Sequence, residues 1–246
     1  MVSVLLLSVD RLAFLQRCVE SILRHTTQTE FEIVFVLQAS PPDIVAYVDS
    51  VPCRKVVHRF DVNVGITPGR NKAMSLATGD FLLFFDDDAY VAERVEHEGR
   101  LFIPQDEHLD WLGRMLKYFA DPEVGVVGQS GTYINPGTPG VFWECKGVGA
   151  ECDVAQGYCY MFRRSMLQDV GYLDPFFGRV WHEESEYALR AKSHGYKVIN
   201  SGYVGVFHLG SASGDDGSYG LKLDYMFAQW SRHFPRILVP RDKWVA

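Results

Sequence analysis

Three adjacent carboxylates, at residues 86–88, directly follow the apolar run Phe81–Phe85. A short apolar run bounded by polar residues predicts a strand that is buried on both faces. Because side chains alternate along a strand, Asp86 and Asp88 are expected on one side and Asp87 on the other. Two oxygen donors at one strand end suit a divalent cation, and such a cation suits a diphosphate group. The alternative at this point is a solvated acidic turn after a buried strand.

The first hundred residues alternate predicted strands with predicted helices. The strands are expected at Val2–Val9, Phe31–Leu37, Lys55–Phe60 and Phe81–Phe85, and the helices at Leu12–Leu23, Pro41–Val48 and Thr67–Leu76. Thr67 is the expected N-cap of the last helix, followed by a proline at its first position. This alternation predicts an α/β fold with a mostly parallel sheet and right-handed crossovers. Ligands bind such sheets beyond the carboxyl ends of the strands, which is where residues 86–88 lie.

The second half of the chain is less regular. Helices are expected at Leu109–Phe119, Ser165–Val170, Glu183–Ser193 and Leu221–Phe234, and strands at Val124–Val127, Tyr158–Phe162, Lys197–Asn200 and Val204–His208. The segment Gly128–Gly149 is rich in Gly, Pro and Thr, which predicts a loop or a hairpin. No linker separates two independent units, so a single domain over residues 1–246 is predicted.

Composition excludes several classes of protein. The 246 residues are 47% hydrophobic and 22% charged, which is ordinary for a globular protein. The net charge of −7 and the lack of a basic stripe argue against nucleic-acid binding. The five scattered cysteines form no Cys-x-x-Cys pair, as expected of reduced thiols in the cytoplasm. The apolar N-terminus reads as a first strand and not a signal peptide, and no apolar stretch approaches the roughly 20 residues that span a bilayer.

Several further segments occur in an order shared with one family. They are Val4–Arg11, Asn63–Gly65 with Gly69–Asn71, Leu83–Asp88, Gly157–Arg164 with Gly171–Asp174, His182–Glu186 with Arg190, and His208–Ser213. With these segments the chain resembles the inverting family 2 glycosyltransferases of GT-A fold, which move a sugar from a nucleotide diphosphate to an acceptor hydroxyl in glycan or polysaccharide biosynthesis. The resemblance covers residues 1–215. It implies a Rossmann-like, mostly parallel central sheet flanked by helices, with a smaller acceptor-side subregion.

The same resemblance divides the chain and assigns its donor side. It implies a nucleotide-sugar-binding half at residues 1–100, an acceptor-binding half at 101–215 and a C-terminal helical tail at 216–246. It also implies Mn²⁺ or Mg²⁺ at an Asp-x-Asp motif, with a UDP, dTDP or GDP sugar as donor. The implied metal ligands are Asp86, Asp88 and His208, and the implied nucleotide-sugar-binding residues are Ser8, Arg11, Gln38, Arg70, Asp86 and Asp87.

One departure from the family pattern leaves the donor nucleotide open. Leu37–Ser40 stands where the family has an aspartate that reads the nucleobase. A leucine side chain accepts no hydrogen bond, so Gln38 or the backbone must read the base, or the base is read otherwise. The Gly-rich segment after His208 is expected to form a lid over the donor.

The resemblance also names a catalytic base. A sugar hydroxyl needs a positioned base at neutral pH, and the family pattern assigns that role to Glu184, with Glu183 as the second choice. The plain alternative is that both carboxylates complement the start of a helix. Acceptor contacts are expected at Trp181 and Glu186, although Glu186 lies four residues before Arg190 and also suits an ion pair. Inversion of an α-linked donor predicts a β-linked product.

Other functions and partners remain open from the sequence. A non-catalytic sugar-nucleotide or glycan-binding module is one alternative. A nucleotidyltransferase is another, but its Gly-rich phosphate loop is missing after Val9. Gln229–Arg232 only echoes the motif of processive synthases, which favours single additions to a glycan or lipid-linked glycan acceptor. The aromatic and basic tail at residues 226–244 is expected to dock on the core, to form a homo-oligomer, or to place the protein peripherally on an anionic membrane.

Overall fold

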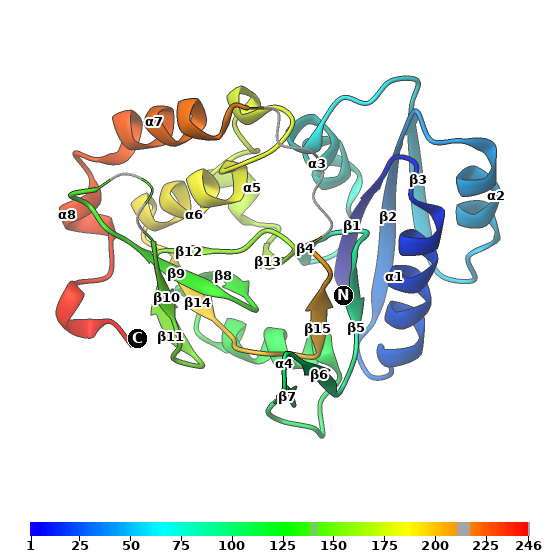
Figure 1. Cartoon of the computed structure of the whole chain (residues 1–246), viewed down its shortest axis with the longest axis horizontal. Helices are drawn as coiled ribbons and strands as arrows, with labels where there is room; N and C mark the ends of the chain where they lie inside the picture. The colour runs from blue at the N-terminus through cyan, green and yellow to red at the C-terminus, as the bar shows by residue number, and fades with distance from the viewer. Residues whose placement is uncertain (139, 141, 211–216, 246) are drawn as a thin grey trace.

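The computed structural model describes residues 1–138, 140, 142–210 and 217–245 (Figure 1). At its centre is an eight-stranded sheet in the order β11-β14-β8-β13-β4-β1-β2-β3. Its strands are β1 (Val2–Ser8), β2 (Phe31–Gln38), β3 (Lys55–Phe60), β4 (Phe81–Phe85), β8 (Val124–Gly128), β11 (Ala150–Cys152), β13 (Cys159–Arg163) and β14 (Lys197–Asn200). The helices are α1 (Leu12–His25), α2 (Pro42–Ser50), α3 (Ile66–Leu76), α4 (Trp111–Leu116), α5 (Met166–Asp169), α6 (Glu183–Ser193), α7 (Tyr219–Trp230) and α8 (Phe234–Ile237).

The sheet is mostly parallel, as the alternating elements predict. β1 pairs in parallel with both β2 and β4, and β2 pairs in parallel with β3. β13 runs antiparallel to both β4 and β8, so β8 and its parallel neighbour β14 share the direction of β4. The carboxyl ends of β1, β4, β8 and β14 therefore meet along one edge of the sheet. The predicted α/β fold with a mostly parallel central sheet is confirmed.

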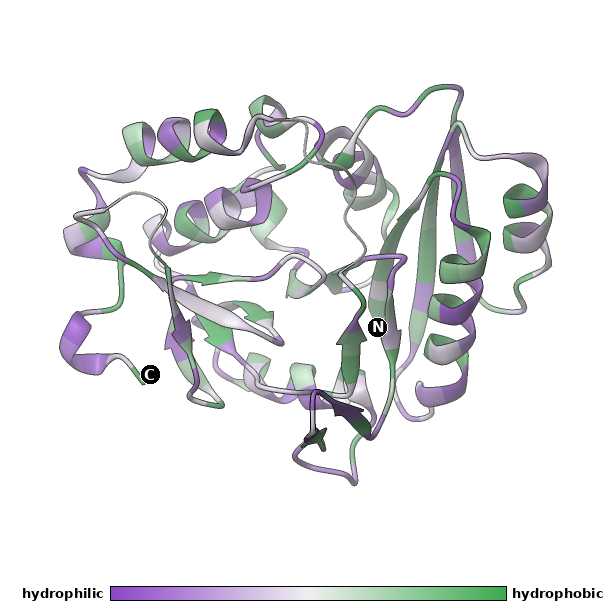
Figure 2. Ribbon diagram, in the orientation of Figure 1, coloured by the Kyte–Doolittle hydropathy of each residue, from purple (hydrophilic) through white to green (hydrophobic). Residues whose placement is uncertain are grey.

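Both faces of the sheet are buried because its central strands β1, β2 and β4 are apolar at nearly every position. In β4, Leu82 and Phe84 belong to the core beneath α3, α6 and α7, whereas Leu83 and Phe85 belong to the core beneath α1, α2 and α4. This is the alternation expected of a strand with helices on both sides. Figure 2 shows the hydrophobic residues concentrated along such central strands as β2. The rigid centre thus holds the end of β4 in place.

The start of α3 differs from the prediction. Gly65, at φ 90°, is the N-cap in place of Thr67. The N–H groups of Ile66 and Thr67 donate to the backbone carbonyls of Arg179 and Gly178, at 3.2 and 2.9 Å. The first amides of α3 are therefore satisfied by the segment that leads into α6, and no threonine side chain is needed. This contact brings the start of α3 close to the start of α6.

Most of the short strands outside the central sheet are absent from the sequence prediction; the exception is Val206–His208, which lies within the predicted strand Val204–His208. β9 (Gly131–Ile134) pairs with β10 (Phe142–Cys145) and with β12 (Val154–Ala155), so the predicted loop or hairpin is in part a small sheet. β5 (Ala89–Val91) pairs with β15 (Val206–His208), and β6 (Val95–His97) forms a hairpin with β7 (Arg100–Phe102). Strands of two to four residues carry too little periodicity to be predicted.

The tail docks on the core, which is one of the three roles expected for it. Met226 and Phe234 are buried in the core, and the Trp244 ring stacks on Tyr133 with centroids 4.9 Å apart. The single-turn helices η1 (Lys117–Ala120), η2 (Pro175–Phe177) and η3 (Arg241–Lys243) complete the described elements, and η3 lies on the surface. All five cysteines are free. None of the described helices is long and apolar enough to cross a bilayer. The single-domain assignment and the division into halves stay predictions.

Asp153 holds the tail in place, which leads to a first testable expectation. Its fully buried carboxylate accepts hydrogen bonds from the N–H groups of Ile134 and Val239, at 2.9 and 2.7 Å, and lies 3.7 Å from Lys192 Nζ. Asp153→Ala would leave the N–H groups of Ile134 and Val239 without this acceptor and would remove one of the carboxylates beside Lys192, so we expect the free energy of unfolding to fall by about 3 kcal/mol. Urea titration measures this loss. Asp242→Ala, at an exposed position of the same tail, is the matched control; equal stability of the two variants would contradict the role of Asp153.

Candidate active site

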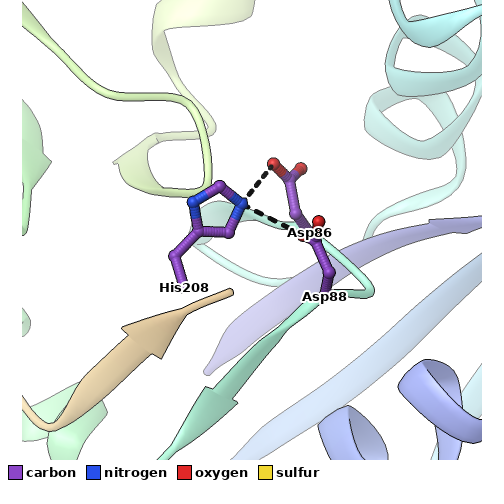
Figure 3. A group of neighbouring side chains, drawn as sticks. All are labelled: Asp86, Asp88 and His208. Atoms are coloured by element: carbon purple, nitrogen blue, oxygen red, sulfur yellow. Dashed lines mark hydrogen bonds and ion pairs between the residues drawn. The ribbon is translucent and has the colours of Figure 1, made fainter. Parts of the chain in front are cut away.

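Asp86, Asp88 and His208 form one cluster at the end of β4 (Figure 3). The antiparallel pairing of β15 with β5 places His208 beside Ala89, immediately after the acidic turn. Its Nε2 lies 3.0 Å from Asp88 Oδ1 and 4.0 Å from Asp86 Oδ2. One candidate ligand atom from each residue lies within 4.8 Å of the others. Two carboxylates and an imidazole are a donor set that suits Mn²⁺, so the residues present fit a divalent cation.

The remaining carboxylate of the turn, Asp87, is not part of this cluster. Asp87 pairs with Arg11, whose guanidinium also lies 3.5 Å from Asp88 Oδ2. Burial raises the pKa of Asp87 to about 6 against the opposing charge of Arg11. Arg11, predicted to bind the donor, therefore lies at the edge of the cluster and offsets part of its negative charge.

His208 is oriented by its neighbours. Its ring stacks on Tyr158 with centroids 4.7 Å apart and parallel planes. Burial lowers the pKa of His208, but the hydrogen bond to Asp88 and the charges of Asp86 and Asp88 outweigh burial and raise it. Tyr158 is in turn held by hydrogen bonds at 3.0 Å to Ser130 and to Gln129. The cluster is thus supported by residues from β8 and from the start of β13.

Arg70 links the acidic turn to the start of α6. Its Nη2 donates to Asp86 and its Nη1 donates to Glu183, each at 2.9 Å, and Nη2 also donates to the Gly157 carbonyl at 3.0 Å. The side chain is buried, and its guanidinium lies 4.5 Å above the Phe84 ring. Both terminal nitrogens are therefore engaged within the protein. This geometry suits a residue that positions two carboxylates, and the expected contact of Arg70 with the donor stays a prediction.

The two candidate base residues lie in different environments. Glu183 is buried and paired with Arg70, while its second oxygen, Oε2, is buried with no hydrogen-bond partner among the described residues. Glu184 is half-buried. Burial, and then the adjacent charge of Glu183, raise the pKa of Glu184 to about 8, although Arg70 opposes the shift. A carboxyl group that exchanges its proton near neutral pH suits acid–base chemistry.

The backbone immediately before α6 is strained. Trp181 and His182 both have positive φ, at 74° and 68°, in the left-handed region that non-glycine residues rarely adopt. Such conformations cost about 1–3 kcal/mol each and concentrate at functional sites. His182 is buried between the rings of Phe142 and Tyr219, and burial lowers its pKa to about 4. This segment sets the direction from which Glu183 and Glu184 enter the site.

The other predicted site residues lie in varied positions. Ser8 Oγ is buried at the end of β1 and has no hydrogen-bond partner among the described residues. Gln38 is buried and accepts hydrogen bonds from the N–H groups of Val64 and Gly65, at 2.9 and 3.1 Å. The side-chain amide oxygen of Gln38 thus holds the loop before α3. The role of Gln38 toward a nucleobase stays a prediction.

The two predicted acceptor residues differ in exposure. Trp181 is 40% exposed, so its ring is accessible to an acceptor and is not packed in the core. Glu186 is buried and forms the ion pair with Arg190 that its spacing suggests, at 2.7 Å. The predicted Gly-rich lid falls mainly on residues 211–216, outside the described residues.

Gly157 is a site residue whose role the sequence reasoning missed. A Cβ at this position would lie 3.1 Å from Arg70 Nη1 and 3.2 Å from Glu184 Cγ. The glycine therefore lets the arginine and the candidate base approach the backbone. The only sequence signal was its place at the start of the Gly157–Arg164 segment, which says nothing of close approach.

Gly157→Ala would separate Arg70 from Glu184 without a backbone conflict. We expect the rate of a reaction that uses Glu184 as its base to fall by about tenfold. We also expect the free energy of unfolding to fall by about 1–3 kcal/mol, because the added methyl group overpacks the site. Gly220→Ala is the matched control, since a Cβ there meets nothing within 4 Å. Kinetics and urea unfolding measured side by side check this expectation, and a Gly157→Ala variant as active as Gly220→Ala would refute it.

Comparison with known families gives a match for the segment that carries the acidic turn. The sequence model of Glycosyl transferase family 2 matches residues 3–97. This segment is therefore similar to glycosyl transferase family 2 over less than half of the chain. The family 2 segment includes Arg70 and Asp86–Asp88, whereas Glu183, Glu184 and His208 lie beyond it. A search of curated proteins gives no match to the chain.

Solved structures with the same fold are distant in sequence. A mannosyltransferase from Pyrobaculum calidifontis in complex with GDP-Man and Mn²⁺ is 20% identical, with a TM-score of 0.61 over 82% of this chain and 55% of that chain. GalNAc-T7 with UDP, GalNAc and Mn²⁺ is 14% identical, with a TM-score of 0.67 over 89% of this chain and 45% of that chain. Residues 1–349 of S. aureus TarS with UDP-GlcNAc are 17% identical, with a TM-score of 0.62 over 96% and 73%.

These likenesses confirm the GT-A fold. The chain spans about half the length of the first two of these structures. Their ligands are properties of those proteins, and any corresponding activity of this chain is a proposal.

Proposed function

We propose that this protein is a metal-dependent, inverting glycosyltransferase that moves a sugar from a nucleotide-diphosphate sugar to an acceptor hydroxyl. The observation that carries the proposal is the chain of contacts from Asp86 through Arg70 to Glu183. It joins a cluster that fits a divalent cation to the start of the helix that holds the candidate base. The match of residues 3–97 to the family 2 model, and the likeness in fold to structures that contain GDP-Man, UDP or UDP-GlcNAc, support the same reaction class.

Each group has a role that follows from its position. Asp86, Asp88 and His208 would hold Mn²⁺ or Mg²⁺, which would stabilise the negative charge that develops on the leaving diphosphate. Glu184 would take the proton from the acceptor hydroxyl. Glu183 and Arg70 would position the site, since they are buried and paired with each other. Ser8, whose buried hydroxyl at the end of β1 has no hydrogen-bond partner among the described residues, would contact the donor nucleotide.

Donor binding can be tested by thermal shift. We expect one of UDP, GDP and dTDP to raise the melting temperature in the presence of Mn²⁺ and to have less effect in its absence, because ligand that binds only the folded state stabilises it. The matching nucleotide sugars, incubated with mixed oligosaccharide acceptors, should then give a product in which NMR shows an inverted anomeric centre. Binding without turnover would favour a non-catalytic sugar-nucleotide module, and a product of retained configuration would remove Glu184 from the base role.

A further inference from the structure

A cavity of about 530 Å³ lies beside the metal-ligand cluster, at the carboxyl edge of the second half of the sheet. Its walls come from the ends of β8 and β14, the start of β13, the β9–β10 hairpin, β15 and β7. The volume is within the range of small-molecule sites. The lining residues that matter for its chemistry are Phe102, Ser130, Tyr158, Tyr203, Phe207 and His208.

The cavity reaches the proposed reaction centre at one end. His208 lines it, and so does Tyr158, the ring stacked on His208. The neighbouring residue, Gly157, is the position against which Glu184 and Arg70 pack. A ligand in this cavity would therefore have one end beside the metal-ligand cluster, one residue along the chain from the glycine against which the candidate base packs.

The lining combines flat aromatic faces with hydrogen-bonding groups. Phe102 and Tyr203 are half-buried with centroids 5.7 Å apart, and Phe207 packs against His97 at 5.0 Å. Ser130 and Tyr158 contribute hydroxyl groups that lie 3.0 Å from each other. A hexose ring has an apolar face that packs on an aromatic ring and a rim of hydroxyls that hydrogen-bond. This mixture suits a carbohydrate better than a purely apolar ligand.

Besides His208, the acidic and basic residues of the lining are Glu144 and Lys146. Glu144 and Lys146 are both exposed, on or beside β10, and carry opposite charges. The cavity therefore carries no net charge from these two residues and does not select for an anionic ligand. Its chemistry favours a neutral sugar unit.

We propose that this cavity is the acceptor subsite and binds a neutral hexose unit of a glycan through Phe102. The proposal rests on the proposed transferase function and adds the place and the class of the acceptor. Phe102 lies on the β6–β7 hairpin, beyond the family 2 segment that ends at residue 97. The subsite is thus built partly from residues that the family match does not contain, and it differs from the earlier expectation that Glu186, buried against Arg190, contacts the acceptor.

Saturation-transfer difference NMR with a panel of methyl hexopyranosides tests the proposal on the full chain in the presence of Mn²⁺ and the stabilising nucleotide. We expect at least one glycoside to receive saturation, and Phe102→Ala to weaken its binding by roughly tenfold through loss of one aromatic face. Leu101→Ala is the matched control, because Leu101 is exposed on the same hairpin and does not line the cavity. Thermal shift with the nucleotide and Mn²⁺ should be the same in all three proteins.

Each outcome decides the proposal. No saturation of any methyl glycoside in the wild type overturns the carbohydrate assignment, and equal binding by Phe102→Ala and the wild type overturns the location. Loss of nucleotide binding in Phe102→Ala places the cavity on the donor side and also overturns the proposal. If the wild type binds no nucleotide, the proposed transferase function itself fails, whatever the glycosides do.

Discussion

Glu184→Gln is expected to lower the rate of sugar transfer by about 10²- to 10⁴-fold, the range that general-base catalysis contributes. The amide keeps the size of the side chain but cannot accept the proton of an acceptor hydroxyl. Nucleotide binding should be unchanged, because the pairing that positions the site runs through Glu183 and Arg70. Initial-rate kinetics give the transfer rate, and a thermal shift with nucleotide and Mn²⁺ gives the binding.

The pH dependence of the wild type follows from the same residue. The pKa of Glu184 is raised to about 8, so the carboxylate that can act as a base increases as pH rises through that value. We expect kcat to rise between neutral pH and about pH 9. The Glu184→Gln variant should lack this rise. A pH profile that is identical in the two proteins would assign the ionisation to another group.

Two further variants separate chemistry from structure. Glu20→Gln alters an exposed carboxylate on α1 and should leave both rate and stability unchanged. Glu183→Gln should instead lower stability, by about 3–5 kcal/mol, because it leaves the buried Arg70 charge without one of its partners. A Glu184→Gln variant with normal sugar transfer, together with a folded Glu183→Gln variant without sugar transfer, would show that Glu183 is the base and that Glu184 is not.

The sequence was sufficient for the fold because the central elements carry strong patterns. β1, β2 and β4 are apolar at nearly every position, and the helices between them begin and end within a few residues of the predicted bounds. The start of α3 was misplaced because its amides are satisfied by the carbonyls of Gly178 and Arg179. A contact between segments more than a hundred residues apart leaves no local signal.

The types of residue in the candidate site could be predicted from the sequence, but most of the contacts between their side chains could not. The acidic turn and His208 follow from the spacing and the family resemblance, and the structure brings Asp86, Asp88 and His208 together. The buried bridge through Arg70 could not be predicted, since an arginine near a helix start is equally consistent with a phosphate contact. The cavity beside His208 also required the structure, because it forms only where predicted strands meet the short, unpredicted strands β7, β9 and β10.

Asp88→Asn is expected to lower Mn²⁺ affinity strongly and to reduce turnover by about 10²- to 10³-fold, as when one group that stabilises developing charge is lost. Asp88 is the carboxylate in direct contact with His208, at 3.0 Å, and a neutral amide is a poorer ligand for a hard cation. Only Asp86 and His208 would remain of the cluster.

The matched control is Asp80→Asn, an exposed carboxylate just before the opposite end of β4. Isothermal titration with Mn²⁺, in the presence of the nucleotide that stabilises the wild type, should show loss of affinity in Asp88→Asn and none in Asp80→Asn. Circular dichroism should show that both variants are folded. Because Asp88 also lies beside Arg11, the loss of its charge removes one of the carboxylates near that guanidinium, while the pair of Arg11 with Asp87 is retained. An Asp88→Asn protein that binds Mn²⁺ as well as the wild type would show that the cation, if required, is held elsewhere.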